Sequence, residues 1–197
     1  MKLDLHQLLE QQAKTSRLIQ DISAVADKLS LQCYLVGGFV RDTLLGRKSK
    51  DIDIVVVGDG LAFADALSYA LNIHPVVKFE AFGTAMIPLE NVELEIATAR
   101  KEVYRRDSRN PDVQATDLKE DLKRRDFTVN AMAIQINREN FGEFIDPFGG
   151  LRDLKARRII TPLDPKETFL GSFAHVSGTA FCRTACVQHR SGYLPGN

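Results

Sequence analysis

The stretch YLVGGFVRDTLLGRKSKDIDIVVV, residues 34–57, predicts the central unit of the fold. It reads as a strand, a glycine turn, a short helix that ends at Gly46, a basic loop and a second strand. Side chains alternate along a strand, so Asp51 and Asp53 are expected on one face while Ile52 points into the core. Two such carboxylates repel each other unless a cation lies between them, and oxygen ligands suit magnesium. A solvated strand start is the alternative interpretation of this pair taken alone.

Paired glycines between the first strand and the short helix favour a nucleotide site. Gly37 and Gly38 would let backbone N–H groups approach a phosphate at the N-terminus of the helix. Arg41 lies on the first turn of that helix, and we expect it to contact phosphate or ribose; a surface ion pair with Asp42 is the alternative. Metal and phosphate features in one unit indicate a site for a nucleoside triphosphate.

The composition sets broad limits on the class of protein. The chain has 197 residues with 26 Lys+Arg against 26 Asp+Glu, so any nucleic-acid binding must depend on a local basic patch. No run approaches the roughly 20 apolar residues of a membrane span. The first 14 residues lack the apolar core of a signal peptide. Three cysteines do not make a disulfide framework, and we therefore expect a cytoplasmic protein without a membrane partner.

Apolar periodicity predicts the elements around the central unit. Residues 3 to about 30 read as one amphipathic helix, and residues 61–71 as another. Strands are expected near residues 75–79, 85–89 and 92–97. Residues 117–136 read as a helix, or as a helix that breaks into a strand after Ala133.

Two acidic residues stand on one face of the strand at residues 92–97. Glu93 and Glu95 alternate with Val92, Leu94 and Ile96, although acidic residues are depleted in strands. Solvent exposure at a sheet edge is one explanation. The other is a third carboxylate that completes the metal site begun by the two aspartates.

Two basic segments follow this strand. Residues 100–109 are rich in arginine and read as a charged loop, which could meet RNA or triphosphate with Tyr104 as a stacking ring. Further on, Arg124, Arg125 and Asp126 are contiguous, so at least one of them faces inward and needs a partner. Asn130 would share a helix face with Asp126, and the two could read a base edge or ribose hydroxyls. An internal ion-pair network is the alternative.

These segments together resemble a known family. The segments and their order along the chain are similar to those of the head of bacterial tRNA nucleotidyltransferases, the CCA-adding enzymes, and of the related bacterial poly(A) polymerases. The resemblance covers roughly residues 33–168. It is carried by LVGGFVRDTLLG, KDIDIVVVG, FGTAMI, VELEIATARKEVYRRDSR, RRDFTVNAMAI and IDPFGGLRDLKARRIITPLDP.

The resemblance implies a fold and a set of site residues. The fold would be α/β (α+β), a polymerase-β-like nucleotidyltransferase head with a mixed sheet backed by helices. Asp51, Asp53 and Glu95 would be the catalytic, magnesium-binding carboxylates, Glu95 matching better than Glu93. The residues that would bind nucleotide are Gly37, Gly38, Arg41, Arg100, Arg124, Arg125, Asp126 and Asn130. Among these, Arg125 would help to distinguish ribose from deoxyribose, and Arg100 would belong to a loop that helps to switch from CTP to ATP.

The implied function is template-independent addition of CCA to tRNA 3′ ends from CTP and ATP. Two magnesium ions would activate the RNA 3′-OH and stabilise the pyrophosphate leaving group. The alternatives are a poly(A) polymerase head and a non-catalytic remnant that binds nucleotide or RNA.

The resemblance stops after Phe169, where the family continues into a helical neck. Residues 171–197 contain two Arg, no Lys and no acidic residue. Reading the possible codons of residues 171–180 one base later permits Asp-Pro-Leu-Arg-Met, as the neck would begin, which suggests a frameshift. We therefore divide the chain into an N-terminal helical segment (1–30), a head domain (31–165) and an aberrant tail (166–197), and expect impaired activity.

The tail also carries cysteines and histidines at spacings that superficially resemble a metal site. They are His175, Cys182, Cys186 and His189. In a frameshifted tail that spacing would be accidental.

Overall fold

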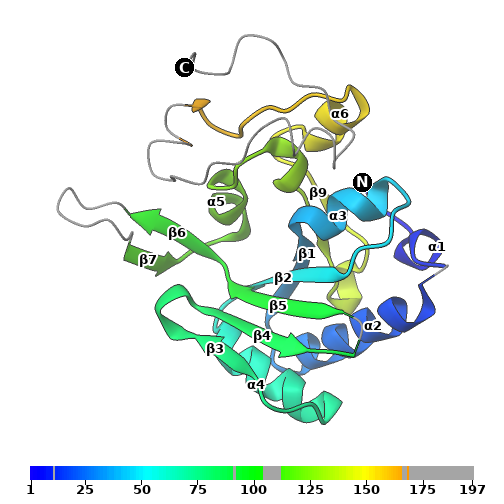
Figure 1. Ribbon diagram of the computed structural model, residues 1–197, viewed down its shortest axis with the longest axis vertical. Coiled ribbons are helices and arrows are strands. Elements are labelled where there is room, and N and C mark those ends of the chain that lie inside the picture. The colour runs from blue at the N-terminus through cyan, green and yellow to red at the C-terminus, as the bar shows by residue number, and fades with distance from the viewer. Residues whose placement is uncertain (11, 91, 104–111, 166–167, 169–197) are drawn as a thin grey trace.

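A computed structural model describes residues 1–10, 12–90, 92–103, 112–165 and 168 (Figure 1). Its helices are α1 (Leu5–Leu8), α2 (Ala13–Lys28), α3 (Gly37–Leu44), α4 (Gly60–Leu71), α5 (Leu118–Lys123) and α6 (Gly150–Lys155), with 3₁₀ turns η1 (Glu80–Phe82), η2 (Thr128–Asn130) and η3 (Arg138–Asn140). Its strands are β1 (Gln32–Val36), β2 (Asp51–Val57), β3 (Val77–Phe79), β4 (Thr84–Pro88), β5 (Glu93–Thr98), β6 (Arg100–Val103), β7 (Asp112–Ala115), β8 (Ala133–Gln135) and β9 (Phe144–Ile145).

Seven of these strands form one mixed sheet, as the resemblance implied. Their order is β3-β4-β5-β2-β1-β8-β9, and β6 and β7 form a separate two-stranded ribbon. The β2–β5 pair is parallel, whereas the other neighbours in the large sheet are antiparallel. Residues 34–57 therefore supply most of β1 and all of β2, which lie in the middle of the sheet.

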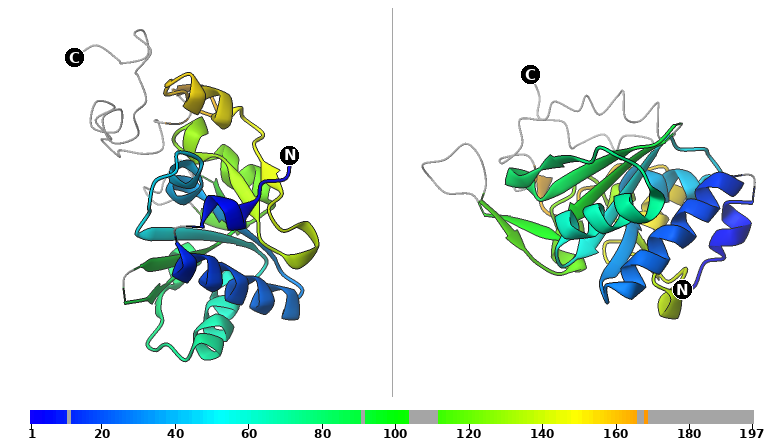
Figure 2. Two further views of the ribbon diagram at one scale, coloured as in Figure 1. Left: turned by 90° about the vertical axis from the view of Figure 1, so that its right-hand side faces the viewer. Right: turned by 90° about the horizontal axis from the view of Figure 1, so that it is seen from below.

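Helices α2 and α4 cover one face of the sheet (Figure 2). Alternate side chains of β2 and β5 enter the core there, among them Ile52, Ile54, Leu94 and Ile96, all at most 1% exposed. Asp59 caps α4 by accepting hydrogen bonds from the N–H groups of Leu61 and Ala62. This packing fixes which face of β2 is buried, and therefore which face carries the aspartates.

The opposite face is covered over part of its length. A smaller apolar cluster there includes Tyr34, Val36 and Val55 of the sheet and Leu118 and Leu122 of α5. This cluster lies at the C-terminal half of β2. The N-terminal half, which carries Asp51 and Asp53, is left for the polar site described below.

The expected helix over residues 3–30 is wrong in one respect, because the chain forms two helices there. Leu5 and Leu9 are buried at 2% and 1% exposure. The segment before α1 is tied to residues 142–144, since the Leu3 N–H donates to the Gly142 carbonyl at 2.7 Å. Helix α2 packs instead on α4 and β1. A straight helix cannot serve both surfaces, so tertiary packing overrides the continuous periodicity.

The long helix expected over residues 117–136 is also shorter than predicted. Asp117 caps α5 by accepting from the Glu120 N–H, but the helix ends at Lys123. The Asp126 carboxylate then accepts from the Phe127 N–H at 2.8 Å, a local bond that competes with the helix. Strand β8 begins at Ala133, which matches the alternative in which the helix gives way to a strand.

The arginine-rich segment after β5 is not a simple loop, because residues 100–103 and 112–115 pair as the β6–β7 ribbon. Tyr104, Arg105, Arg106 and Arg109 lie outside the described residues, as do the tail cysteines and histidines. Within the described ranges, no helix has the length and apolar character needed to cross a membrane.

Candidate active site

Four carboxylates project from the open face of the sheet where β2 and β5 run parallel. Their register places Asp51 opposite Glu93 and Asp53 opposite Glu95. Directly paired residues point to the same face, so the two rows stand side by side. Because β5 lies between β2 and β4, exposure at a sheet edge does not explain Glu93 and Glu95, and that alternative is wrong.

A cavity of about 290 Å³ lies over this row of carboxylates. Of the predicted site residues, Gly38, Arg41, Asp51, Asp53 and Glu95 line it; the other lining residues are Phe39, Asp42, Ser49, Met86 and Glu93. A second hollow of about 490 Å³ between α1 and α2 is more open and lies away from these carboxylates. The smaller cavity is therefore the one that joins acidic side chains to the glycine turn.

Asp53 is the least solvated of the carboxylates on the open face. It is half-buried, whereas Asp51, Glu93 and Glu95 are exposed. Burial raises the pKa of Asp53 above its ordinary value, the nearby charge of Arg125 lowers it, and the negative charges of Glu95 and Asp51 raise it further. The fold thus holds a carboxylate where its charged form is disfavoured, a situation that a bound cation would reverse.

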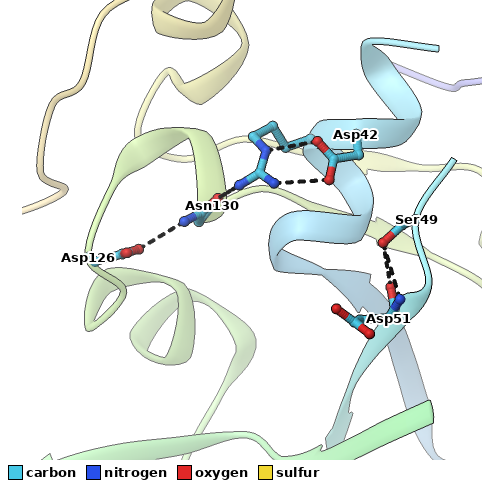
Figure 3. A network of polar contacts seen from close by, with 6 residues as sticks. Asp42, Ser49, Asp51, Asp126 and Asn130 are labelled. Atoms are coloured by element: carbon cyan, nitrogen blue, oxygen red, sulfur yellow. Dashed lines mark hydrogen bonds and ion pairs between the residues drawn. The ribbon is translucent and has the colours of Figure 1, made fainter. Parts of the chain in front are cut away.

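The start of β2 is fixed by Ser49. Its hydroxyl donates to the Asp51 carbonyl at 2.9 Å, and the Asp51 N–H donates back to the Ser49 hydroxyl oxygen at 3.3 Å. Figure 3 shows the Asp51 carboxylate turned away from Ser49. The backbone of Asp51 is therefore held while its side chain remains available to the cavity.

Gly37 makes room for the site by lacking a side chain. Its φ is +66°, and a Cβ there would lie 2.8 Å from Asp53 Oδ2 and 3.1 Å from Arg125 Nη1. Both the left-handed backbone and the space require glycine. The sequence suggested a phosphate-binding turn at this position, and the structure adds that Gly37 lets an aspartate and an arginine approach each other.

A chain of polar contacts joins α3 to the segment after α5 (Figure 3). Arg41 donates to Asp42 through Nε at 3.1 Å and Nη2 at 2.9 Å, and through Nη1 to the Asn130 side-chain oxygen at 2.7 Å. The Asn130 amide donates in turn to Asp126 at 3.1 Å. The ion pair with Asp42 that the sequence left as an alternative is formed, and contact of Arg41 with nucleotide stays a prediction. Asp126 and Asn130 do meet, although across a 3₁₀ turn and not along a helix.

Arg124 and Arg125 share one buried carboxylate, that of Asp121. The ion-pair distances are 3.0 Å and 3.2 Å, and Asp121 is 0% exposed. This is the internal network that the sequence left as an alternative. Arg100 begins β6, and its guanidinium donates to the Phe82 carbonyl. The structure therefore gives each of these predicted nucleotide-binding arginines a protein partner, and does not test whether nucleotide binds them.

Residues 33–160 match the family of the poly A polymerase head domain, which is more than half of the chain. The chain belongs to this family. An A-adding tRNA nucleotidyltransferase of Aquifex aeolicus is 49% identical over 137 residues, which are 68% of this chain and 16% of that protein. A CC-adding tRNA nucleotidyltransferase of Deinococcus radiodurans is 42% identical over 134 residues, 68% of this chain and 35% of that protein.

Solved structures show the same fold. A CCA-adding enzyme of Thermotoga maritima complexed with tRNA superposes with a TM-score of 0.79 at 34% identity, covering 96% of this chain and 43% of that one. The polymerase-β-like mixed α/β head that the sequence indicated is therefore confirmed. This chain spans less than half the length of each of these three relatives.

Two residues of the head domain site escaped the sequence analysis. Asp121 carries a recognisable signal, because an aspartate three and four residues before two arginines on a helix can pair with both. Asp42 was noted as a possible ion-pair partner, but its place in the lining of the cavity depends on how α3 packs on β2. That packing is a long-range contact, which local spacing does not reveal.

Proposed function

We propose that this head domain transfers nucleotides from CTP and ATP to the 3′ end of tRNA, without a nucleic-acid template and with magnesium. The observation that carries the proposal is the parallel register of β2 and β5, which places Asp53 beside Glu95 under one cavity. The names of the relatives, which add A, CC or CCA to tRNA, support the choice of substrate. Asp51, Asp53 and Glu95 are the proposed catalytic carboxylates.

The carboxylates suit a magnesium ion in chemistry, and they need to rearrange to hold one. Oxygen donors are the ligands that magnesium prefers, and the raised pKa of Asp53 follows from burial and from unneutralised neighbours. In the described part of the chain, no three acidic, histidine or cysteine side chains converge on one point. Because three of the four carboxylates are exposed, their side chains can turn toward a shared ion at little cost in packing.

Bound magnesium would lower the pKa of the attacking RNA hydroxyl and stabilise the leaving pyrophosphate. The side chains of the protein would orient the nucleotide and the RNA end. Arg125 and Arg41 bring positive charge near Asp53, as their effects in lowering its pKa show. Positive charge at this position would favour the negatively charged transition state of phosphoryl transfer. The N-terminal N–H groups of α3 at Gly37 and Gly38 are the proposed phosphate contacts.

A poly(A) polymerase activity is the second candidate, because the matching family takes its name from that enzyme. In this proposal the same head-domain site would support either activity. The two differ in whether CTP is used, so the same experiment separates them.

The test is incorporation of labelled CTP and ATP onto a tRNA that lacks its 3′ CCA, using the full chain with magnesium. We expect CCA ends at a reduced rate, since this chain spans less than half of its relatives' length. A-only tails would favour poly(A) polymerase. A double variant, Asp51→Ala with Asp53→Ala, should abolish whatever incorporation is seen.

Glu95→Gln and Glu93→Gln form a matched pair for the third carboxylate. Both residues are exposed on the same strand and face. We expect the Glu95 variant to lose most of the incorporation and the Glu93 variant to retain it. Equal losses would contradict the assignment of Glu95. If the unmodified chain binds ATP without incorporating nucleotide, the proposal fails and a non-catalytic remnant is favoured.

A further inference from the structure

Asp121 is a fully buried carboxylate at the end of α5 that accepts four hydrogen bonds. Its Oδ1 accepts from Arg124 Nε at 3.2 Å, from Arg124 Nη2 at 3.0 Å and from the Arg100 N–H at 3.2 Å. Its Oδ2 accepts from Arg125 Nη2 at 3.2 Å. One aspartate therefore satisfies two guanidinium groups and the first peptide N–H of β6. A buried carboxylate with this many donors is held in one position.

The guanidinium of Arg125 faces two ways. On one side it pairs with Asp121, and on the other Nη1 lies 3.1 Å from the point where a Gly37 Cβ would stand. Asp53 Oδ2 lies 2.8 Å from that same point. The Nε of Arg125 is buried and has no hydrogen-bond partner among the described residues. Among the described residues, Asp121 is thus the hydrogen-bond partner that anchors the Arg125 side chain.

Without that anchor, Arg125 would lose its hydrogen bond to Asp121 and keep its attraction to the partly exposed Asp53. Arg124 precedes it and carries the same charge, and long arginine side chains turn to water when no partner holds them. Both arginines are partly exposed, at 24% and 18%, so solvent is accessible to each. The negative charge of the buried Asp121 holds both guanidinium groups close to the protein interior.

We propose that Asp121 is a positioning residue for nucleotide binding: it holds Arg125 toward Asp53 and the cavity, and it ties that arginine to the start of β6. The inference rests on the proposed function, because it assigns Asp121 a task in the same site. Asp121 itself does not line the cavity and acts through Arg125.

The test is a double-mutant cycle on ATP affinity, measured by titration of the full chain with magnesium present. We expect Asp121→Asn and Arg125→Gln each to weaken ATP binding about tenfold or more, the loss typical of one charge-assisted contact. The double variant should bind no more weakly than either single variant, because both changes remove the same contact. A purely structural role of Asp121 would make the two losses multiply.

Asp153→Asn is the matched control. Asp153 is also 0% exposed and is also paired with arginines, but on α6, where its partners are Arg158 and Arg152. We expect this variant to lower the melting temperature as Asp121→Asn does, while leaving the ATP affinity within about twofold of the unmodified chain, because its partners Arg152, Arg158 and Thr128 do not include Arg125. Equal weakening of ATP binding by both variants would overturn the proposal.

Two further results complete the test. If Asp121→Asn does not fold, Asp121→Asn combined with Arg124→Gln restores the balance of charge, and this pair of changes should still weaken ATP binding relative to Arg124→Gln alone. ATP affinity unchanged in that variant, or in Asp121→Asn, overturns the inference alone. If the unmodified chain binds no ATP, the proposed function fails and the inference falls with it.

Discussion

The carboxylates on the open face of the sheet and those buried in ion pairs are held in opposite ways. Asp53 sits beside Glu95 and close to Asp51, and its pKa is raised by burial and by these neighbours. Asp121 and Asp153 are more deeply buried, at 0% exposure, yet each is surrounded by arginines and hydrogen-bond donors. Asp53 is under electrostatic strain, whereas Asp121 and Asp153 are compensated.

This difference separates the carboxylates that are candidates for the site from those that support the fold. A group that destabilises the folded chain, and is nevertheless held in a cavity, is a candidate for binding or catalysis. A buried carboxylate with satisfied bonds supports the structure, unless its partner leads into the site, as Arg125 does for Asp121. If candidates for the site were ranked by burial alone, Asp121 and Asp153 would stand above Asp53.

The largest effect should come from Asp53→Asn. Magnesium ions supply several kcal/mol of transition-state stabilisation, and each 1.36 kcal/mol is a tenfold change in rate, so incorporation should fall about a thousand-fold. The free energy of unfolding in magnesium-free buffer should stay the same or rise, because an electrostatically strained charge is removed. Denaturant unfolding and labelled-nucleotide incorporation would measure the two. A clear loss of stability would place Asp53 with the compensated group.

The next largest effect should come from Gly37→Ala, which tests whether Asp53 and Arg125 need the space at this turn. The left-handed φ of +66° and the 2.8 Å approach to Asp53 should together cost about 2–3 kcal/mol of unfolding free energy. ATP affinity should fall as well, since Asp53 and Arg125 must move.

Gly46→Ala is the control for that variant. Gly46 has a φ of +68° and nothing within 4 Å of its added Cβ, so it carries the backbone cost without the clash. We expect a smaller loss of stability and unchanged ATP affinity. Equal effects at both glycines would mean that the close approach at Gly37 is unimportant.

Asp153→Asn tests the buried carboxylates that are compensated by ion pairs. The Asp153 carboxylate accepts from Thr128 Oγ1 at 2.9 Å and from Arg158 Nη2 at 3.2 Å. Removing its charge should lower the free energy of unfolding by on the order of 2 kcal/mol, less than for a fully buried pair because Arg158 is 35% exposed. Chemical denaturation would measure this, and an unchanged midpoint would contradict it.

The smallest effect concerns pH. Because the folded pKa of Asp53 lies above its ordinary value of 3.8, the folded chain holds this proton to higher pH than the unfolded chain does. Asp53 therefore contributes stability at acid pH, and this contribution is lost as the pH rises through its folded pKa. Relative to Asp53→Asn, the unmodified chain should lose stability over that rise in magnesium-free buffer. A difference in unfolding free energy that stays constant with pH would exclude a raised pKa.

The sequence predicted the parts of the site that depend on local spacing. The period of two in a strand placed Asp51 and Asp53 on one face, and the glycine pair marked the turn before α3. The strand that carries Glu95 was found in the same way. Residue spacing could not predict that this strand pairs with β2. Which strands become parallel neighbours depends on the packing of the whole sheet, and neither segment alone determines it.

The misses have a common physical origin in tertiary contacts. Residues 3–30 have continuous helical periodicity, but the chain before α1 is bonded to Gly142 while α2 packs on α4 and β1, and so the helix divides. Asp126 and Asn130 were expected to meet along a helix, but α5 ends at Lys123 and the two side chains meet across the 3₁₀ turn η2. The division of the chain at residues 30 and 165, and the frameshifted tail, stay predictions.

The parallel pairing of β2 with β5 also bears on the order in which the chain folds. Between the two strands lie α4 and the β3–β4 hairpin, so Asp53 and Glu95 come together after a long segment has closed into place. A partly folded chain, or one still emerging during synthesis, cannot yet present the combined carboxylates. Ligands that need both residues would bind the finished sheet and not its precursors, and would therefore pull late folding steps toward completion.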